Sequence, residues 1–272
     1  MAAPADDAVG ATARSGVFAR VVVGVDGTPE ALEGLRQAAL LREPGGELTI
    51  VAAWMPLPPV LSPVGSDSGQ LEEAELRARA EIASREARDL LGTAPAIVVR
   101  NVAWRALLGE AGRQDATLVV IGSHGQSRVL GMLAGSTTTE LVHKASCSVL
   151  VARAADGRFP HRIVVGVDGS PESAEAYHSA RQLAKRFDAE LWPVVAHGSE
   201  GVDKALVSQI VDHHHEDLQD EPVDALLAAA AEADLLVVGS RGLHGLKALG
   251  SVSEQVAHRA HCSTLVVRAL PR

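Results

Sequence analysis

The chain has 272 residues, of which 47% are hydrophobic and only 3% aromatic, and its formal net charge is −9. This length fits one large or two medium domains, and the acidic balance argues against nucleic acid or an anionic membrane surface as the main partner. Two cysteines, Cys147 and Cys262, are too few for a disulfide framework. No apolar run approaches the about 20 residues of a membrane helix, and the first residues resemble no signal peptide. We therefore expect a cytoplasmic protein with no membrane partner and a disordered extension over residues 1–17.

Apolar runs alternate with helical patterns along the first half of the chain. We predict strands at 21–25, 48–54, 97–100, 118–121 and 148–151, and helices at 31–41, 71–91, 104–113 and from about 136. Pro44, Gly45 and Gly46 are expected to end the first of these helices, and 56–69 is expected to be a loop. Strands that alternate with helices in this way indicate a parallel sheet built from βαβ units.

Three blocks of the first half recur in the second half in the same order. They pair residues 21–30 with 163–172, residues 118–125 with 235–242, and residues 135–151 with 250–266. The separation falls from 142 to 117 and then to 115 residues, so the second copy is shorter, mainly between its first two blocks. Such ordered self-similarity indicates an internal duplication. We predict a first domain at 18–153, a linker at 154–161, and a second domain at 162–272 that is shortened between its second and fourth strands.

The middle of the second copy supports two interpretations. Residues 191–196 form its predicted second strand, although Pro193 is unexpected in a central strand. Residues 201–217 fit a helix, and the alternative is a strand at 206–211 with the helix deleted. Residues 217–220, where the third strand belongs, are almost all polar. We therefore expect a short helix here and a weak or absent edge strand.

A glycine motif follows the fourth predicted strand. Gly122-Ser123-His124-Gly125 is followed, after nine residues, by Gly135-Ser136 and a predicted helix. Glycine lets the backbone approach a phosphate closely, and a helix N-terminus offers unpaired N–H groups to an anion. The alternative is a tight strand-to-helix turn that needs glycine only for packing. The glycine–serine pair at the helix start favours phosphate binding.

Both copies resemble the universal stress protein domain. The resemblance rests on the Val-Val-Gly-Val-Asp-Gly opening, on Gly-Ser-His/Arg-Gly after the fourth strand, and on a closing Gly-Ser, helix and Cys-Ser-Val/Thr-Leu-Val. It covers nearly everything from Phe18 to Ala269 and is similar to the tandem-domain type of the family. For each copy it implies a Rossmann-like α/β fold, similar to the adenine nucleotide alpha hydrolases, with a five-stranded parallel sheet of order 3-2-1-4-5 and helices on both faces. It also implies that the last strands pair the two domains within one chain, and that the protein forms a homodimer.

The ATP-binding branch of this family carries G-x-x-G, nine residues and then G-S/T. The first copy matches this pattern in full, whereas the second has seven intervening residues, which leaves ATP binding by the second copy open. The ligand would lie at the carboxyl ends of the strands, where the strand order reverses. In the first copy, the ATP-binding residues implied by the resemblance are Asp26, Ala53, Trp54, Gly122, Ser123, Gly125, Gly135, Ser136 and Thr137. In the second copy, they are Asp168, Gly239, Gly242, Gly250 and Ser251.

Two of these assignments have structural alternatives. Asp26 would accept hydrogen bonds on the ribose or adenine side of the nucleotide, or it is an Asp-Gly turn residue that binds its own backbone. Its recurrence as Asp168 does not separate the two, because a turn would be duplicated as well. Backbone groups of Ala53 and Trp54 would face the adenine, or Trp54 packs beneath the loop.

The sequence offers little for catalysis, and we assign no catalytic residue. The glycine motif has no Walker A lysine and no accompanying carboxylate cluster, so Mg²⁺ or Mn²⁺ would be held through the ATP phosphates rather than by a metal site of the protein. His124 is the one candidate base, and Arg128 could supply charge in the loop. Adjacent histidines at 213–215 point in different directions on a helix, which predicts a polar surface instead of a metal site.

The resulting prediction is an ATP-binding, regulatory stress-response protein with little or no catalytic turnover. One alternative is a weak ATPase or another nucleotide-using enzyme. A second alternative is a dimeric stress protein that binds no nucleotide. The intact glycine motif of the first copy argues against the second alternative, and the missing lysine and carboxylates argue against the first.

Overall fold

The computed structural model describes residues 18–56, 66–92, 94–123, 136–155, 157, 159–196, 204–211, 216–218, 220–240 and 252–268, with the side chains of 66–72, 136 and 204 also left out. In the first unit, residues 18–153, strands and helices alternate along the described residues. They are β1 (Phe18–Val25), α1 (Pro29–Leu41), β2 (Arg42–Trp54), α2 (Ser66–Leu91), β3 (Ala96–Arg100), α3 (Ala103–Arg113), β4 (Leu118–Gly122), α4 (Ser136–Lys144) and β5 (Ser148–Ala152). The predicted extension at 1–17 lies outside the described residues.

The second unit, residues 162–268, repeats this order with shorter elements in its middle. They are β6 (Arg162–Gly166), α5 (Pro171–Phe187), β7 (Glu190–Ala196), α6 (Lys204–Ile210), β8 (Glu216–Leu218), α7 (Pro222–Ala229), the 3₁₀ turn η3 (Ala230–Glu232), β9 (Leu235–Gly239), α8 (Val252–Arg259) and β10 (Ser263–Val267).

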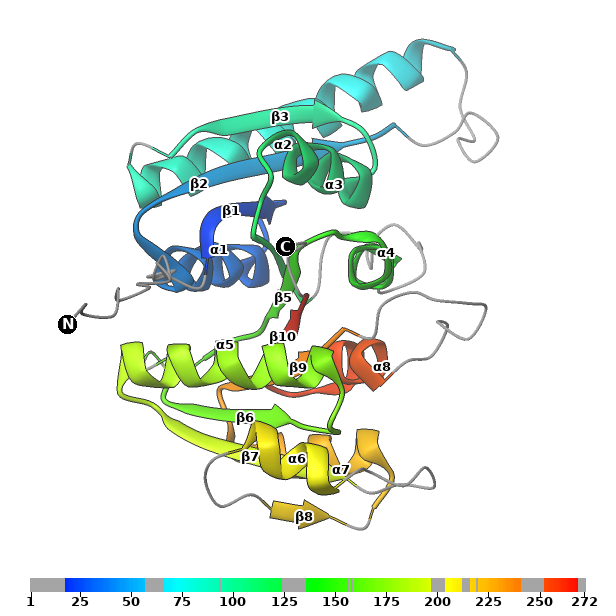
Figure 1. Ribbon diagram of the computed structural model, residues 1–272. Coiled ribbons are helices and arrows are strands. Elements are labelled where there is room, and N and C mark those ends of the chain that lie inside the picture. Colours follow the sequence, from blue (N-terminus) through cyan, green and yellow to red (C-terminus); the bar gives the residue numbers. More distant parts are fainter. Residues whose placement is uncertain are drawn as a thin grey trace, which may run out of the picture.

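One continuous sheet joins the two units (Figure 1). Its ten strands run in the order β3-β2-β1-β4-β5-β10-β9-β6-β7-β8, so each half has the predicted order 3-2-1-4-5. Every neighbouring pair is parallel except β5 and β10, which are antiparallel and place Leu150 opposite Leu265. The predicted α/β fold class is therefore confirmed, and the last strands pair within the chain as the resemblance implies.

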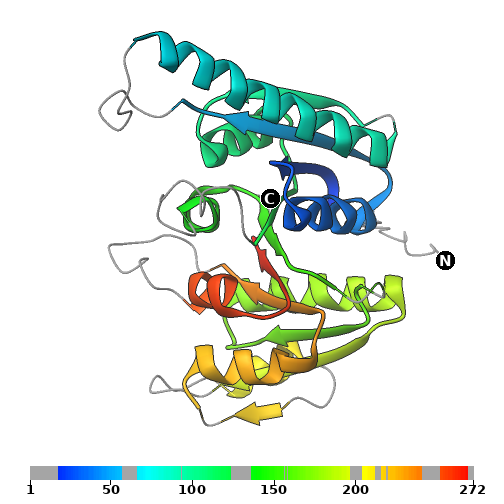
Figure 2. The same ribbon diagram turned by 180° about the vertical axis from the view of Figure 1, so that it is seen from behind.

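Helices cover both faces of the sheet (Figure 2). One face packs against α1, α2, α5 and α6, and its core includes Leu35, Ala83, Leu183 and Val207. The other face packs against α3, α4, α7 and α8, with Leu107, Leu141, Leu226 and Val256 in its core. The central strands β4 and β9 are buried on both faces, which is why they appear in the sequence as continuous apolar runs without alternation.

The Pro-Gly-Gly segment corrects one prediction. Helix α1 ends at Leu41, but the next strand begins at Arg42 instead of residue 48, so Pro44 to Gly46 lie within β2. The register between β1 and β2 shifts there, from Phe18 opposite Arg42 to Arg20 opposite Glu47. The extra residues of β2 form an irregularity in the pairing, and a Cβ on Gly46 would lie 2.7 Å from the carbonyl oxygen of Ala19. Gly46 therefore permits close strand contact in this segment, and Gly45 takes a positive φ of 79°.

The middle of the second unit confirms the expected weak edge. Helix α6 has seven residues and β8 has three, at the outer edge of the sheet. The wider helix at 201–217 and the alternative strand at 206–211 are both wrong, because the helix spans Lys204–Ile210. Pro193 is tolerated in β7 for a reason of direction. The carbonyl of Val194 accepts from the N–H of Val167, just after β6, so the nitrogen of the neighbouring Pro193 faces the other way. On that side β8 pairs only from Val194 onward, so no hydrogen bond is lost there.

Candidate functional site

The carboxyl ends of three strands bring the predicted residues of the first unit to one level. Val25 of β1 lies opposite Ala52 of β2, and Val23 lies opposite Val120 of β4. Continuing these registers places Asp26 beside Ala53 and Ser123. Figures 1 and 2 show that the arrowheads of β2 and β6 point to the same side of the molecule, so the equivalent edges of the two units face one direction.

Gly122 ends β4 where helix α1 begins. A Cβ on Gly122 would lie 2.6 Å from the carbonyl carbon and oxygen of Glu30 and 2.7 Å from the nitrogen of Ala31. Gly239 has the same environment, 2.6 Å from the carbonyl of Glu172. These distances are far below van der Waals contact, so only glycine allows the first turn of the helix to rest on the end of the strand. Close backbone packing therefore explains this glycine in both units.

The residues that follow Gly122 and Gly239 donate a backbone hydrogen bond to the neighbouring strand or its end. The N–H of Ser123 donates to the carbonyl oxygen of Ala152 at 2.8 Å, and that of Ser240 donates to Val267 at 2.9 Å. The amide of Ser123, predicted to bind phosphate, is thus used by the neighbouring strand.

Asp26 forms the turn that the sequence offered as an alternative to ligand binding. Its Oδ1 accepts from the backbone N–H of Thr28 at 3.1 Å and from the Thr28 hydroxyl at 2.6 Å. Thr28 is also the N-cap of α1, because its hydroxyl accepts from the N–H of Ala31 at 3.3 Å. The carboxylate therefore orients the capping hydroxyl and fixes the start of α1.

The second unit repeats this turn with an added link. Asp168 Oδ1 accepts from the N–H of Ser170 at 3.0 Å and from its hydroxyl at 2.5 Å, and Ser170 caps α5. In addition, Ser173 Oγ accepts from the N–H of Asp168 at 3.3 Å, whereas Ala31 stands at the equivalent position of the first unit. The aspartate turn of the second unit is thus tied more closely to its helix.

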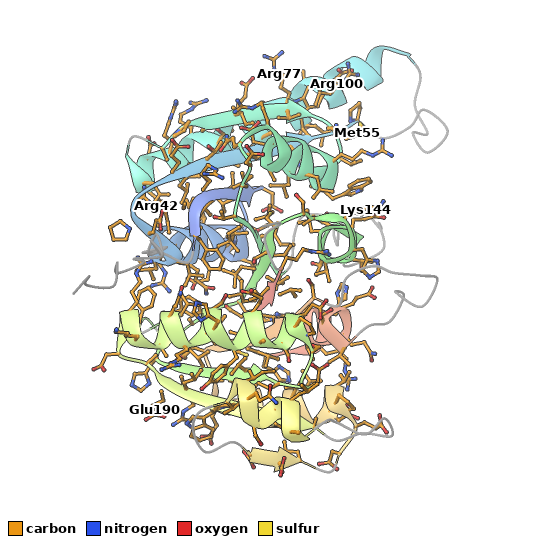
Figure 3. The ribbon with its side chains drawn as sticks, in the orientation of Figure 1. Arg42, Met55, Arg77, Arg100, Lys144 and Glu190 are labelled. Atoms are coloured by element: carbon orange, nitrogen blue, oxygen red, sulfur yellow. The ribbon has the colours of Figure 1, made fainter. Side chains whose placement is uncertain are left out.

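Trp54 lies in a charged setting that sequence reasoning missed. The guanidinium of Arg100, at the end of β3, lies 5.5 Å from the centre of the Trp54 ring, and Arg100 Nη2 lies 3.0 Å from Glu73 Oε1 of α2. Arg100 and Met55 are labelled in Figure 3 at this edge of the sheet. The carbonyl of Trp54 accepts from the N–H of Asn101 at 2.9 Å. The position of Arg100, a charged residue directly after the apolar run 97–99, was the signal that could have placed it at the end of a strand.

The phosphate part of the predicted site is described only at its margins. Helix α4 begins at Ser136, and the half-buried Thr137 follows it in the first turn. The hydroxyl of Thr137 makes no hydrogen bond with the residues that the structure describes. Several predicted residues lie outside the described residues, namely Gly125, Gly135, Gly242, Gly250 and Ser251, together with His124, Arg128 and the histidines at 213–215.

The model of the universal stress protein family matches residues 18–153 and 198–268. The chain belongs to the universal stress protein family. Universal stress protein Rv2623 of Mycobacterium tuberculosis is 29% identical over 306 aligned residues, covering 91% of this chain and 96% of the relative. Universal stress protein Rv2005c of the same organism is 30% identical over 293 residues, with the same coverage.

A solved structure shows that this universal stress protein shares the whole fold of a relative. A universal stress protein from Archaeoglobus fulgidus superimposes with a TM-score of 0.70 at 17% identity, covering 93% of this chain and 97% of the other. Within the described ranges, no helix has both the length and the apolarity needed to cross a membrane. The same ranges contain no group of three or more side chains placed to hold a metal ion.

The two cysteines of this universal stress protein are buried, and each directly precedes the last strand of its unit. Burial raises the pKa of Cys147 to about 11, with the positive charge of Arg268 acting in the opposite direction. Burial likewise raises the pKa of Cys262 to about 11, against the charge of Arg153. A thiol of this pKa stays protonated near neutral pH and is a poor nucleophile. Both cysteines therefore act as small packing residues.

Proposed function

We propose that this universal stress protein binds ATP at the carboxyl edge of its first unit and acts as a regulator with little or no turnover. The observation that supports this most is the complete G-x-x-G, nine-residue, G-S spacing between the end of β4 and the start of α4. The segment begins at the end of β4, beside β1, where the strand order reverses, and open α/β sheets bind ligands at such a point.

The surrounding residues suit a nucleotide. The first turn of α4 offers backbone N–H groups and the hydroxyl of Thr137 to phosphate. Asp26 and the Arg100–Trp54 pair flank the strand ends on the other side, where ribose and base would lie. In this proposal Mg²⁺ or Mn²⁺ is held through the phosphates of ATP, because no carboxylate cluster accompanies the glycine motif in the sequence. Two chains form a homodimer in the same proposal.

The decisive test replaces the first residue of α4 with aspartate. Asp is favoured at helix starts, so Ser136→Asp should keep the helix while placing a negative charge against phosphate. Isothermal titration with ATP and Mg²⁺ should give binding to the wild type and a loss of about 100-fold or more for Ser136→Asp. Ser251→Asp is the matched control, because Ser251 is the equivalent residue of the second unit.

Failure has a clear form in this test. If wild-type protein shows no binding at millimolar ATP, or Ser136→Asp binds as tightly as wild type, the proposed site is wrong. Phosphate release during the same incubation separates the regulatory role from a weak ATPase. A steady release that His124→Ala abolishes would assign catalysis to the loop and overturn the proposed lack of turnover.

A further inference from the structure

The helix that begins at the proposed ATP site is held at its other end by the opposite unit. Arg268 directly follows β10 of the second unit, and its Nη2 donates to the carbonyl oxygens of Val142 at 2.6 Å and His143 at 3.2 Å. These carbonyls belong to the last turn of α4 in the first unit. The last carbonyls of a helix have no partner within the helix, so Arg268 supplies the missing donors and a favourable positive charge.

The reverse contact has the same form. Arg153 follows β5 of the first unit, and its Nη2 donates to the carbonyl oxygens of Ala257 at 2.7 Å and His258 at 3.2 Å, in the last turn of α8. Arg153 and Arg268 are 115 residues apart, the same separation as the closing blocks of the repeat. Each unit therefore caps the last helix of the other with an equivalent arginine.

Both guanidinium groups are partly buried where the two units meet. Burial lowers the pKa of Arg153 and of Arg268 from the usual arginine value, but a guanidinium still remains charged at physiological pH. Charge-assisted hydrogen bonds of this kind are about twice as strong as neutral ones. A shorter side chain at either position would leave the helix carbonyls without their donor.

A second set of contacts holds the middle of α4. Thr139 donates from its hydroxyl to Glu254 Oε1 of α8 at 3.2 Å, and His143 Nε2 lies 3.1 Å from Glu254 Oε2. His258 Nε2 lies 2.9 Å from the hydroxyl oxygen of Thr139. The side chains of His143 and Glu254 are only 18% and 12% exposed, so solvent weakens this pair little. Helix α4 is thus fixed to the second unit along its length as well as at its end.

We propose that Arg268 is a positioning residue for the ATP site of the first unit, although it belongs to the second unit. Helix α4 has nine residues and a length of about 13 Å, so it moves as a short rigid rod. Fixing its last turn therefore fixes the direction in which its first turn presents N–H groups. Glu254 supports the same position from α8. This inference rests on the proposed function.

The test measures ATP affinity by isothermal titration in a Ser251→Asp background, so that the measured heat of binding comes from the first unit alone. Arg268→Gln should weaken ATP binding about tenfold, and Arg268→Lys, which keeps the charge, should recover most of that loss. Arg153→Gln is the matched comparison, because it removes the equivalent hydrogen bonds from α8 and leaves those to α4 intact. It should change the affinity less than about twofold. Arg259→Gln, which removes an exposed ion pair with Asp224, controls for loss of a surface charge.

The outcomes separate the two proposals. If the background protein itself fails to bind ATP, the proposed function fails. If it binds ATP and Arg268→Gln binds equally well, only the positioning role of Arg268 is wrong. If Arg268→Gln and Arg153→Gln weaken ATP binding equally, the arginines act through overall stability and the positioning role is again wrong. Should Arg268→Gln not fold, Glu254→Gln takes its place, with Glu232→Gln at an exposed carboxylate as its control, and unchanged affinity for Glu254→Gln contradicts the proposal.

Discussion

At the end of the first strand, the two units share nearly every contact, whereas farther out along the sheet they differ. Asp26 with Thr28 and Asp168 with Ser170 build the same turn and the same helix cap. Gly122 and Gly239 allow the same approach of strand and helix. These contacts join the sheet to α1 or α5, and they are needed whether or not a ligand binds. Their presence in both units is therefore explained by folding.

The outer strands and the loops distinguish the units. Helix α2 has 26 residues and β3 has five, whereas α6 has seven and β8 has three. The Arg100–Trp54 pair lies on the outer strands of the first unit, and the glycine segment there has nine residues between its glycines against seven in the second. The comparison suggests that ligand specificity depends on the outer strands and on the glycine segment. The predictions below test this division.

The largest expected effect comes from restoring the loop length of the second unit. If the missing two residues abolish ATP binding there, inserting Gly-Ser between Gly242 and Gly250 should create a second site. Titration with ATP should then give two ATP per chain where the wild type gives one. The same dipeptide inserted after Asp220 should leave one. A stoichiometry that stays at one after the first insertion would show that loop length is not the limiting difference.

The next effect tests whether the glycines serve the fold. Gly122→Ala and Gly239→Ala should each lower the free energy of unfolding by about 3 kcal/mol, because the added Cβ meets helix backbone that cannot move aside. Urea unfolding followed by circular dichroism measures the loss. Gly109→Ala in α3 is the control, because its Cβ meets nothing within 4 Å. If Gly239→Ala lowers the free energy of unfolding much less than Gly122→Ala does, the two packing sites are not equivalent.

The last prediction concerns the buried thiols of Cys147 and Cys262, and its effect appears only at high pH. Their pKa is raised from 9.0 to about 11 in the folded protein, so unfolded thiols ionise first as the pH rises. Their contribution is fully present below about pH 9 and is lost toward pH 11, by at most about 3 kcal/mol for each thiol. Urea unfolding at about pH 8 and about pH 10.5 should show this loss in the wild type and much less of it in a Cys147→Ala/Cys262→Ala variant. An identical loss in both proteins would show that it does not come from these thiols.

Sequence reasoning predicted the features that depend on local pattern. The buried strands and the shortened middle of the second unit follow from apolar runs and from the repeat, whereas the strand order was implied by the family resemblance. It placed Pro44 to Gly46 wrongly, because an irregularity in strand pairing and a turn use the same residues. Whether Gly122 serves packing or phosphate also depends on which backbone lies near it, and only tertiary structure shows that α1 does.

The meeting of strand ends at one edge was predictable from the sequence, but the contacts made there were not. Asp26, Ala53 and Ser123 do lie at one edge, since the ends of parallel strands meet there. The role of Arg100 required knowing that β3 pairs beside β2 and that α2 brings Glu73 to the same place. Arg153 and Arg268 recur in register in the sequence, but their exchange between units follows only from the antiparallel pairing of β5 and β10.

Thr139 and Glu254 occupy equivalent positions, 115 residues apart, and face each other at the junction. In a symmetric pair of identical single-unit chains, any residue at this position would meet its own copy. Two glutamates there would repel each other, and two threonines would leave His143 without its carboxylate. Covalent fusion of the units removes that constraint, because each position can change alone. A tandem chain can therefore hold an unequal pair at its centre, and its two halves are free to diverge in what they bind.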